Sequence, residues 1–303
     1  MWFRIFLLCW LLGGGQSLYP KTSTLGNPPK WELLDPWQST ITRDQFQSLL
    51  AKVYCPREAW WKPWIVIEQG KARIRKQAGK KDWYDLSFCK KPKEPTGSPK
   101  KRKSLKGLKI ALDPGHIGGK YSEMEGRHFV MGKDSPVKEG DLSLETALKL
   151  KKILESLEAE VILVRSKPEP VTSKRPEDFA KEAQEWIAGR GLEKLKKEEK
   201  EKLLKKRKEM LFYRVSEIHA RARLVNEKIR PDLVVCLHLN ASAWKDPEKK
   251  ELSERNDFHV LVNGCYMGGE LALDDQRFEM MLRLLGGWHD LERRLAENVS
   301  VAL

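Results

Sequence analysis

Two histidines and one glutamate stand where a folded sheet would bring them together. His116 follows the apolar run at 109–114, Glu139 precedes a stretch of helical spacing at 140–157, and His238 lies near the end of another apolar run. Because the carboxyl ends of parallel strands lie at one edge of a sheet, we expect these three side chains to converge. Two imidazoles and one carboxylate, with a fourth position for water, form the ligand set of a catalytic zinc site.

The glycines around His116 fit this chemistry better than they fit a phosphate loop. Gly115, Gly118 and Gly119 allow a sharp turn and leave room above a metal. Neither G-x-x-x-x-G-K-[ST] nor G-x-G-x-x-G occurs in the chain, which argues against a phosphate cradle. Taken singly, each ligand also has an ordinary explanation, such as a glutamate that stabilises a helix start. A bound zinc would lower the pKa of water to about 7 and polarise a substrate carbonyl.

The elements that position these residues predict an α/β fold. Apolar runs predict four strands, and helical spacing predicts the helix at 140–157 between the first two. Such alternation favours a mostly parallel sheet covered by helices on both faces. A charged insertion at 175–216 is expected to form a solvated helix or helical hairpin, and a lid over the site is the alternative. The four expected strands lie at 108–114, 159–165, 232–242 and 257–264.

The region before the sheet is expected to contain three parts. Residues 1–19 have one early Arg and an apolar run followed by glycines, the layout of a secretory signal peptide. Residues 20–89 are rich in Trp and predict a small α+β module, with a helix at 42–54 and a strand or hairpin at 64–76. We expect its tryptophans to form a core rather than to stack on sugars. Residues 90–106 form a basic linker.

The charge of the chain is concentrated in that linker. The 303 residues carry a formal net charge of +14, which suggests a polyanionic partner. The linker holds eight Lys or Arg against one Glu, and so supplies half of this excess. Specific nucleic-acid binding is therefore not expected, and the anionic cell envelope is the simpler partner for an exported basic protein.

The cysteines predict no thiolate metal site, because no C-x-x-C occurs. Cys55 and Cys89 flank the Trp-rich segment and would be able to pair in an oxidising compartment. Cys236 and Cys265 lie in apolar runs and are expected to be buried thiols.

Four separated segments resemble the zinc-dependent N-acetylmuramoyl-L-alanine amidases of bacterial cell walls. They are "IALDPGHIGG", "VKEGDLSLETALKLKKILE", "EVILVR" and "HARARLVNEKIRPDLVVCLHLNAS", and the resemblance covers about residues 107–303, which would form the catalytic domain. It implies hydrolysis of the amide between N-acetylmuramic acid and L-alanine in peptidoglycan.

The resemblance also implies roles for individual residues. His116, Glu139 and His238 match the zinc ligands of the family. Asn240 matches the position just past the third ligand and would orient the site, and Gly118 and Gly119 would support the site or the substrate. Arg223 and Asn226 match a supporting helix.

One feature of the family is missing from the expected place. The family uses a general acid/base glutamate at the end of a late strand. Here the chain ends in "HDLERRLAENVSVAL", which resembles the preceding helix, so we expect this glutamate to lie beyond Leu303. Glu270 and Glu254 are the alternatives within the chain.

The resulting expectation is an exported hydrolase of linear amides that acts on peptidoglycan in the periplasm or cell wall. Cell-envelope regulatory proteins are further expected partners, and no transmembrane segment is expected in the mature chain. The alternative function is a catalytically impaired amidase-like protein that binds peptidoglycan or regulates other enzymes.

Overall fold

The computed structural model describes residues 22–23, 26–91, 104–192, 194–240, 246, 251 and 254–302. The expected signal peptide and most of the basic linker lie outside these residues. Contacts divide the chain into two compact units. The first contains the described residues between 99 and 253, and the second contains those before 99 together with 254–302. Within the described ranges, no helix is long and apolar enough to cross a membrane.

The first unit is built on a parallel sheet of three strands in the order β7-β4-β8. Leu112 of the central strand is in register with Leu163 on one side and with Val235 on the other. All three strands therefore end at the same edge. The strands are β4 (Lys109–Pro114), β7 (Glu160–Leu163) and β8 (Leu233–Leu237).

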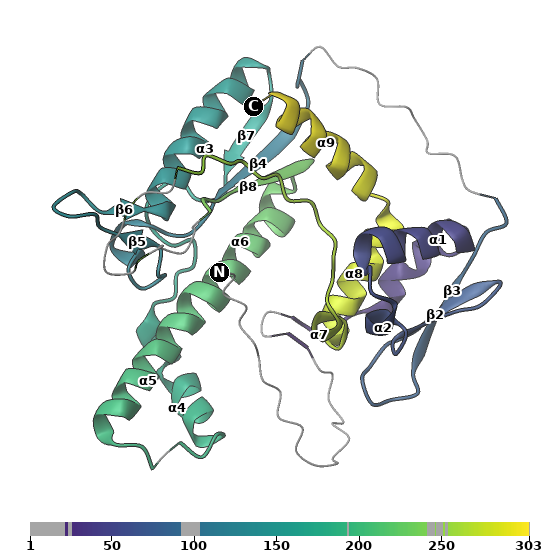
Figure 1. Ribbon diagram of the computed structural model, residues 1–303, viewed down its shortest axis with the longest axis horizontal. Helices are drawn as coiled ribbons and strands as arrows, with labels where there is room; N and C mark the ends of the chain where they lie inside the picture. The colour runs from purple at the N-terminus through teal and green to yellow at the C-terminus, as the bar shows by residue number, and fades with distance from the viewer. Residues whose placement is uncertain are drawn as a thin grey trace. The chain divides into compact units, whose positions relative to one another are not determined.

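Helices cover both faces of this sheet, as the sequence predicts. Helix α3 (Glu139–Ser156) lies along one face, where Ala147 and neighbouring leucines pack on the strands (Figure 1). The helical turn η6 (Leu224–Ile229) packs Ile229 against Ala111 on the opposite face. The α/β prediction is confirmed, and α3 begins within one residue of the predicted helix.

The predicted fourth strand is wrong in the described structure. Residues 257–262 make no sheet ladder, and Leu261 is 90% exposed. Their alternating pattern predicts a strand only if a partner edge is available. The chain is instead tied just afterwards, where the N–H groups of Cys265 and Tyr266 bind carbonyls of the second unit. Cys236 and Cys265 are both exposed, so their predicted burial is also wrong. For Cys236 the reason is that the described residues leave its face of β8 exposed, as they also leave Val234 on the same face.

Two smaller features of the first unit surround the sheet. The charged insertion is helical, as predicted, and its helices α4 (Ala180–Ala188) and α5 (Lys197–Met210) extend away from the sheet (Figure 1). Helix α6 (Glu217–Arg223) continues toward the site through η5 (Leu211–Ser216). A short antiparallel pair, β5 and β6, precedes α3 and joins His128–Phe129 to Val137–Lys138.

The second unit combines an antiparallel meander with helices. Thr42 caps α1 through a reciprocal capping box with Gln45. Trp31 and Trp61 are buried in the core, which supports the structural role expected for the tryptophans. The meander contains β1 (Ile65–Ile67), β2 (Lys71–Arg75) and β3 (Trp83–Ser87). The helices before it are η1 (Trp31–Trp37), α1 (Arg43–Leu49), η2 (Leu50–Tyr54) and α2 (Glu58–Trp61).

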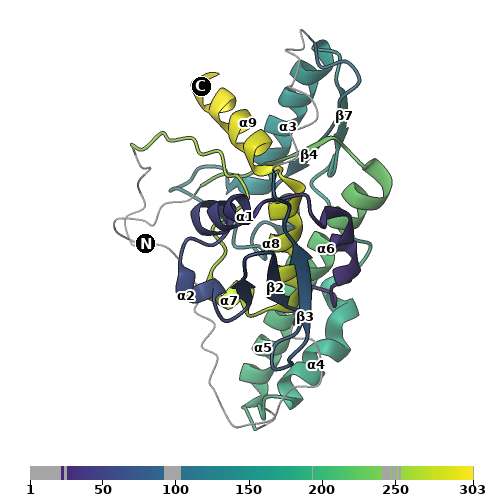
Figure 2. The ribbon, with the colours of Figure 1, turned by 90° about the vertical axis from the view of Figure 1, so that its right-hand side faces the viewer.

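The C-terminal helices belong to this second unit, which differs from the single domain expected over 107–303. Helix α8 (Asp274–Gly286) lies beside the meander and adds Met280 and Met281 to its core (Figure 2). The fully buried Arg277 fastens it there, because its guanidinium donates to the carbonyl of Arg75 at 2.7 Å. The other C-terminal helices are α7 (Gly268–Leu271) and α9 (His289–Ala302). Cys55 and Cys89 are both free thiols.

Candidate metal centre

The turn after β4 brings two strand ends close together. His116 has a φ of 59°, in the left-handed region that non-glycine residues rarely adopt. The N–H of Gly115 donates to the carbonyl of Leu237 at 2.8 Å. A Cβ on Gly115 would lie 2.5 Å from the ring of His238. Glycine at this position therefore allows the side chains that follow β4 and β8 to meet.

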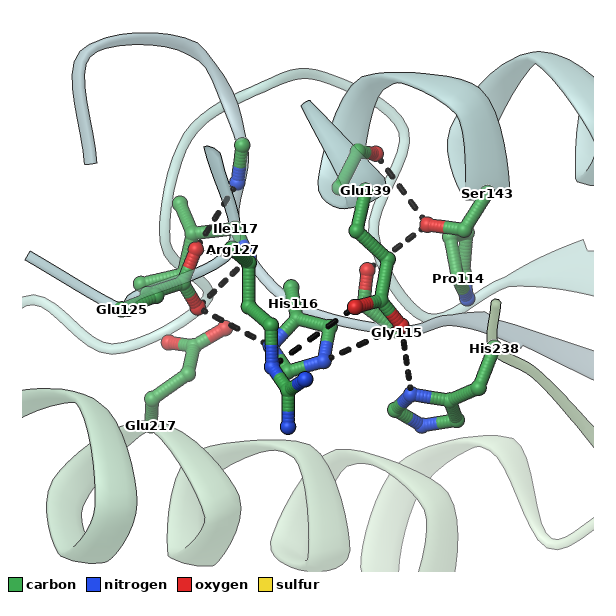
Figure 3. Close-up of polar contacts among 12 residues, drawn as sticks. Pro114, Gly115, His116, Ile117, Glu125, Arg127, Glu139, Ser143, Glu217 and His238 are labelled. Atoms are coloured by element: carbon green, nitrogen blue, oxygen red, sulfur yellow. Dashed lines mark hydrogen bonds and ion pairs between the residues drawn. The ribbon is translucent and has the colours of Figure 1, made fainter. Parts of the chain in front are cut away.

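Glu139 lies between the two histidines (Figure 3). Its Oε1 is 3.2 Å from Nε2 of His116 and 3.4 Å from Nδ1 of His238. One ligand atom from each of the three residues lies within 4.8 Å of the other two. The residues come from the end of β4, the first position of α3 and the residue after β8. The predicted convergence is thus present, because these three positions share one edge of the sheet.

A buried carboxylate lies behind His116 and holds the same turn. Both oxygens of Glu125 accept the N–H of Ile117, at 2.9 and 3.0 Å, and one also accepts the N–H of Gly118 at 3.1 Å. Its Oε1 is 3.7 Å from Nδ1 of His116, and its side chain is 3% exposed. A carboxylate behind a ligating histidine fixes the tautomer and the ring orientation. Glu125 is placed to do this for His116 while Nε2 faces Glu139.

Two buried arginines hold the backbone on either side of the site. The guanidinium of Arg221 donates to the carbonyls of Pro114 and His116, both at 2.7 Å. Arg165 donates to the carbonyl of Gly140 at 2.8 Å, and so ties β7 to the first turn of α3. Burial, and then the nearby charge of Arg221, lower the pKa of Arg165 to about 10. These bonds occupy the carbonyls of the turn and leave the ring of His116 facing the cluster.

Glu139 and His116 stabilise each other's charged forms. Burial raises the pKa of Glu139, but hydrogen bonds with His116 and His238 and from the N–H of Leu239 outweigh it and hold the pKa far below its usual range. Burial lowers the pKa of His116, and the carboxylates of Glu125 and Glu139 reverse this to a net increase. The site therefore holds an ionised carboxylate that favours a cation.

The predicted supporting residues have distinct positions. Gly118 has a φ of 76° and donates to Glu125, and the N–H of Gly119 donates to the carboxylate of Asp141 at 2.7 Å. Both glycines thus shape the turn that carries His116. Asn240 is exposed two residues after His238, and its orienting role stays a prediction.

The two glutamates proposed as alternative acid/base groups both lie in the second unit. Glu270 accepts the N–H of Met267 at 2.7 Å and so caps α7. Glu254 is exposed at the start of the C-terminal segment. Neither is part of the described cluster of metal-ligating side chains.

Sequence reasoning missed Glu125, Arg165 and Arg221. On α6 and η6 it selected Arg223 and Asn226, which are exposed, whereas Arg221 reaches the turn. The helical period gives a signal for this choice, because Arg221 lies one turn after the buried Glu217 and pairs with it at 2.8 Å. Glu125 lies in an irregular polar segment and has no such signal.

The residues present fit a zinc ion. Two imidazoles and one carboxylate are a known zinc donor set, and donor atoms at about 2.0–2.1 Å from a tetrahedral ion lie about 3.3–3.4 Å apart. The contacts of Glu139 with the two histidines, at 3.2 and 3.4 Å, are close to that spacing. The site also has the carboxylate behind a histidine that metal sites commonly show.

Residues 110–251 match the family model described as N-acetylmuramoyl-L-alanine amidase. The matched segment contains His116, Glu139 and His238, and it lies within the first unit. No curated protein and no solved structure matches the chain.

Proposed function

We propose that residues 110–251, which match the family model described as N-acetylmuramoyl-L-alanine amidase, form a domain that hydrolyses the amide between N-acetylmuramic acid and L-alanine with a zinc ion. The observation that carries the proposal is the convergence of His116, Glu139 and His238 inside the matched segment. The family match supports a peptidoglycan amidase domain in general terms. The metal and the bond cleaved are the proposed part.

In this proposal different residues of the chain bind the metal, orient a ligand and hold the backbone of the site. His116, Glu139 and His238 would hold zinc, which supplies an activated water and polarises the carbonyl of the amide. Glu125 keeps the ring of His116 oriented through its Nδ1 edge. Arg221 fixes the carbonyl of His116 and so the left-handed turn. The side chain of His238 is 55% exposed, which leaves this side of the cluster accessible to a substrate.

A second function is favoured by the state of the neighbouring carboxylates. Asp113 accepts from Arg221 at 2.7 Å, Glu125 accepts two backbone N–H groups, and Asp141 accepts the N–H of Gly119. Within the described part of the first unit, these acids are thus engaged in holding the site. A protein of this kind that lacks a proton acceptor would bind peptidoglycan, or regulate other enzymes, without cleaving it.

Incubation of the full chain with purified sacculi and zinc separates the two functions. Mass spectrometry of the soluble fraction should show stem peptides with a free N-terminal L-alanine, and a chelator or H238A should abolish them. H259A, which removes a half-exposed histidine of the second unit, should release them at the rate of the unmodified protein. Co-sedimentation with sacculi without release would favour the binding function, and absence of both would refute the two proposals together.

The place of action follows as part of the same proposal. A protein that acts on peptidoglycan works outside the cytoplasmic membrane, in the periplasm or cell wall. The basic balance of the chain, with its formal charge of +14, suits an anionic envelope. Envelope regulatory proteins are proposed as further partners, and co-purification from cross-linked cells would test them.

A further inference from the structure

We propose that Arg127 binds a substrate carboxylate one residue beyond the scissile amide, and thereby selects stem peptides whose acidic residue after L-alanine is not amidated. This inference rests on the proposed function and names the substrate class that the same site prefers.

The backbone of Arg127 is anchored at the metal cluster. Its carbonyl accepts the N–H of Glu139 at 3.2 Å, and its own N–H donates to the carbonyl of Ser122 at 2.9 Å. The next residue, His128, begins β5 and contacts Ser122 through Nδ1 at 3.1 Å. The side chain of Arg127 points toward the cluster and lies in front of His116 (Figure 3). Arg127 is therefore held beside the reacting position by the strand pair that leads into α3.

Its guanidinium has unused donors. Nε of Arg127 is 3.6 Å from Oε2 of Glu139, an ion-pair distance that is too long for a hydrogen bond. Among the described residues, Glu139 is its only partner, and its side chain is 42% exposed. Arg165 and Arg221 differ from it, because they are buried and donate to carbonyls of the turn. Arg127 thus keeps a forked set of donors directed toward solvent at the edge of the site.

The charge balance favours an anion at this position. Glu139 is the carboxylate that faces Arg127, and it is also the carboxylate placed between His116 and His238. When Glu139 is committed to a divalent cation, the positive charge of Arg127 is no longer balanced by it. A carboxylate is the natural partner of a free guanidinium, since two parallel N–H···O bonds match its planar geometry.

The substrate of the proposed reaction offers such a group near the bond that is cut. In stem peptides the residue after L-alanine carries either a free carboxylate or its neutral amide. The amide has one oxygen in place of two and no charge, so it loses the bidentate, charge-assisted pair. We therefore expect the zinc-loaded protein to bind the acid form about tenfold or more tightly than the amide form.

The test compares two synthetic ligands, muramoyl-L-alanyl-D-glutamate and the corresponding D-isoglutamine compound, on the zinc-loaded full chain. Competition binding should show the preference for the acid, and R127M should reduce it to less than about twofold, chiefly by weakening the acid form. R127K should keep part of the preference. R190M is the matched control, because it removes an exposed arginine from the turn that follows α4, a helix that extends away from the sheet, and it should leave the ratio unchanged.

Zinc affinity, measured by chelator competition, is the second readout. It should be the same for R127M and the unmodified protein. A lower zinc affinity, or equal weakening of both ligands, would mean that Arg127 only supports Glu139 and would overturn the inference, as would equal binding of the two ligands by the unmodified protein. Preference for the acid without hydrolysis would support the carboxylate site and refute the proposed reaction. Hydrolysis of sacculi without the preference would support the reaction and refute the carboxylate site.

Discussion

Replacing Glu125 by glutamine should lower both the zinc affinity of the site and the free energy of unfolding of the first unit, and the two losses can be measured separately. The carboxylate is buried, accepts the N–H groups of Ile117 and Gly118, and lies 3.7 Å from Nδ1 of His116. Glutamine keeps one acceptor oxygen for the backbone but removes the charge behind the histidine. Changes behind a metal ligand reduce affinity about 10–100-fold, and we expect a loss in this range.

The cost to the fold follows from the two backbone bonds. Hydrogen bonds to a charged acceptor contribute about 1.5–3 kcal/mol each and neutral ones about 0.5–1.5, so two weakened bonds should lower the free energy of unfolding by about 2 kcal/mol. Urea unfolding of the zinc-free protein measures this term. Competition against a fluorescent chelator, without urea, measures the loss of zinc affinity.

The control is D274N in the second unit. Asp274 is a buried carboxylate that accepts the N–H of Ala78 at 3.1 Å and pairs with Arg277. This change should destabilise its own unit and leave zinc affinity unaltered. If E125Q loses the expected stability but binds zinc as tightly as the unmodified protein, Glu125 supports only the turn, and the orienting role assigned to it is wrong.

Three further outcomes are expected. G115A should reduce zinc affinity at least about tenfold in chelator competition, because its Cβ would lie 2.5 Å from the ring of His238. R277L should lower the unfolding free energy of the second unit by about 3–5 kcal/mol in urea, because it removes the buried positive charge that pairs with the carboxylate of Asp274. Burial raises the pKa of Tyr54 to about 12 from its ordinary 10.0. The unfolded state therefore loses this proton first, and stability should fall as the pH rises from about 10 to 12. Circular dichroism melts should show a shallower alkaline loss for Y54F.

The sheet of the first unit was readable from sequence because local pattern and tertiary packing agree there. The runs that form β4, β7 and β8 are mostly apolar, and the central strand β4 packs against other residues on both of its faces. The segment 257–264 has an equally good strand pattern and forms no strand. An alternating pattern shows only that a segment can form a strand, and a strand also needs the free edge of a sheet to pair with. Here the N–H of the neighbouring Cys265 donates to the carbonyl of Val53 instead.

Part of the metal centre could also be predicted from the sequence, because its ligands lie at the ends of predictable elements. His116, Glu139 and His238 each stand at the end of an element, and the topology of a parallel sheet brings such ends together. Arg127 and Glu125 lie in the irregular segment between η3 (Gly119–Tyr121) and β5, where no period relates sequence spacing to direction. Their contacts depend on the path of that segment, which becomes apparent only in the folded chain.

The surroundings of His116 imply that the site forms before the metal enters. Glu125 holds the N–H groups that follow the turn, Arg221 holds the carbonyl of His116, and Ser143 donates to the carbonyl of Gly115 at 2.7 Å. None of these bonds involves a group of Glu139 or His238. Small zinc domains are unfolded without metal because their ligands have no other support. Here the frame is self-supporting, so circular dichroism spectra with and without zinc should superpose, and a large gain of helix on adding zinc would show that the metal itself organises the turn.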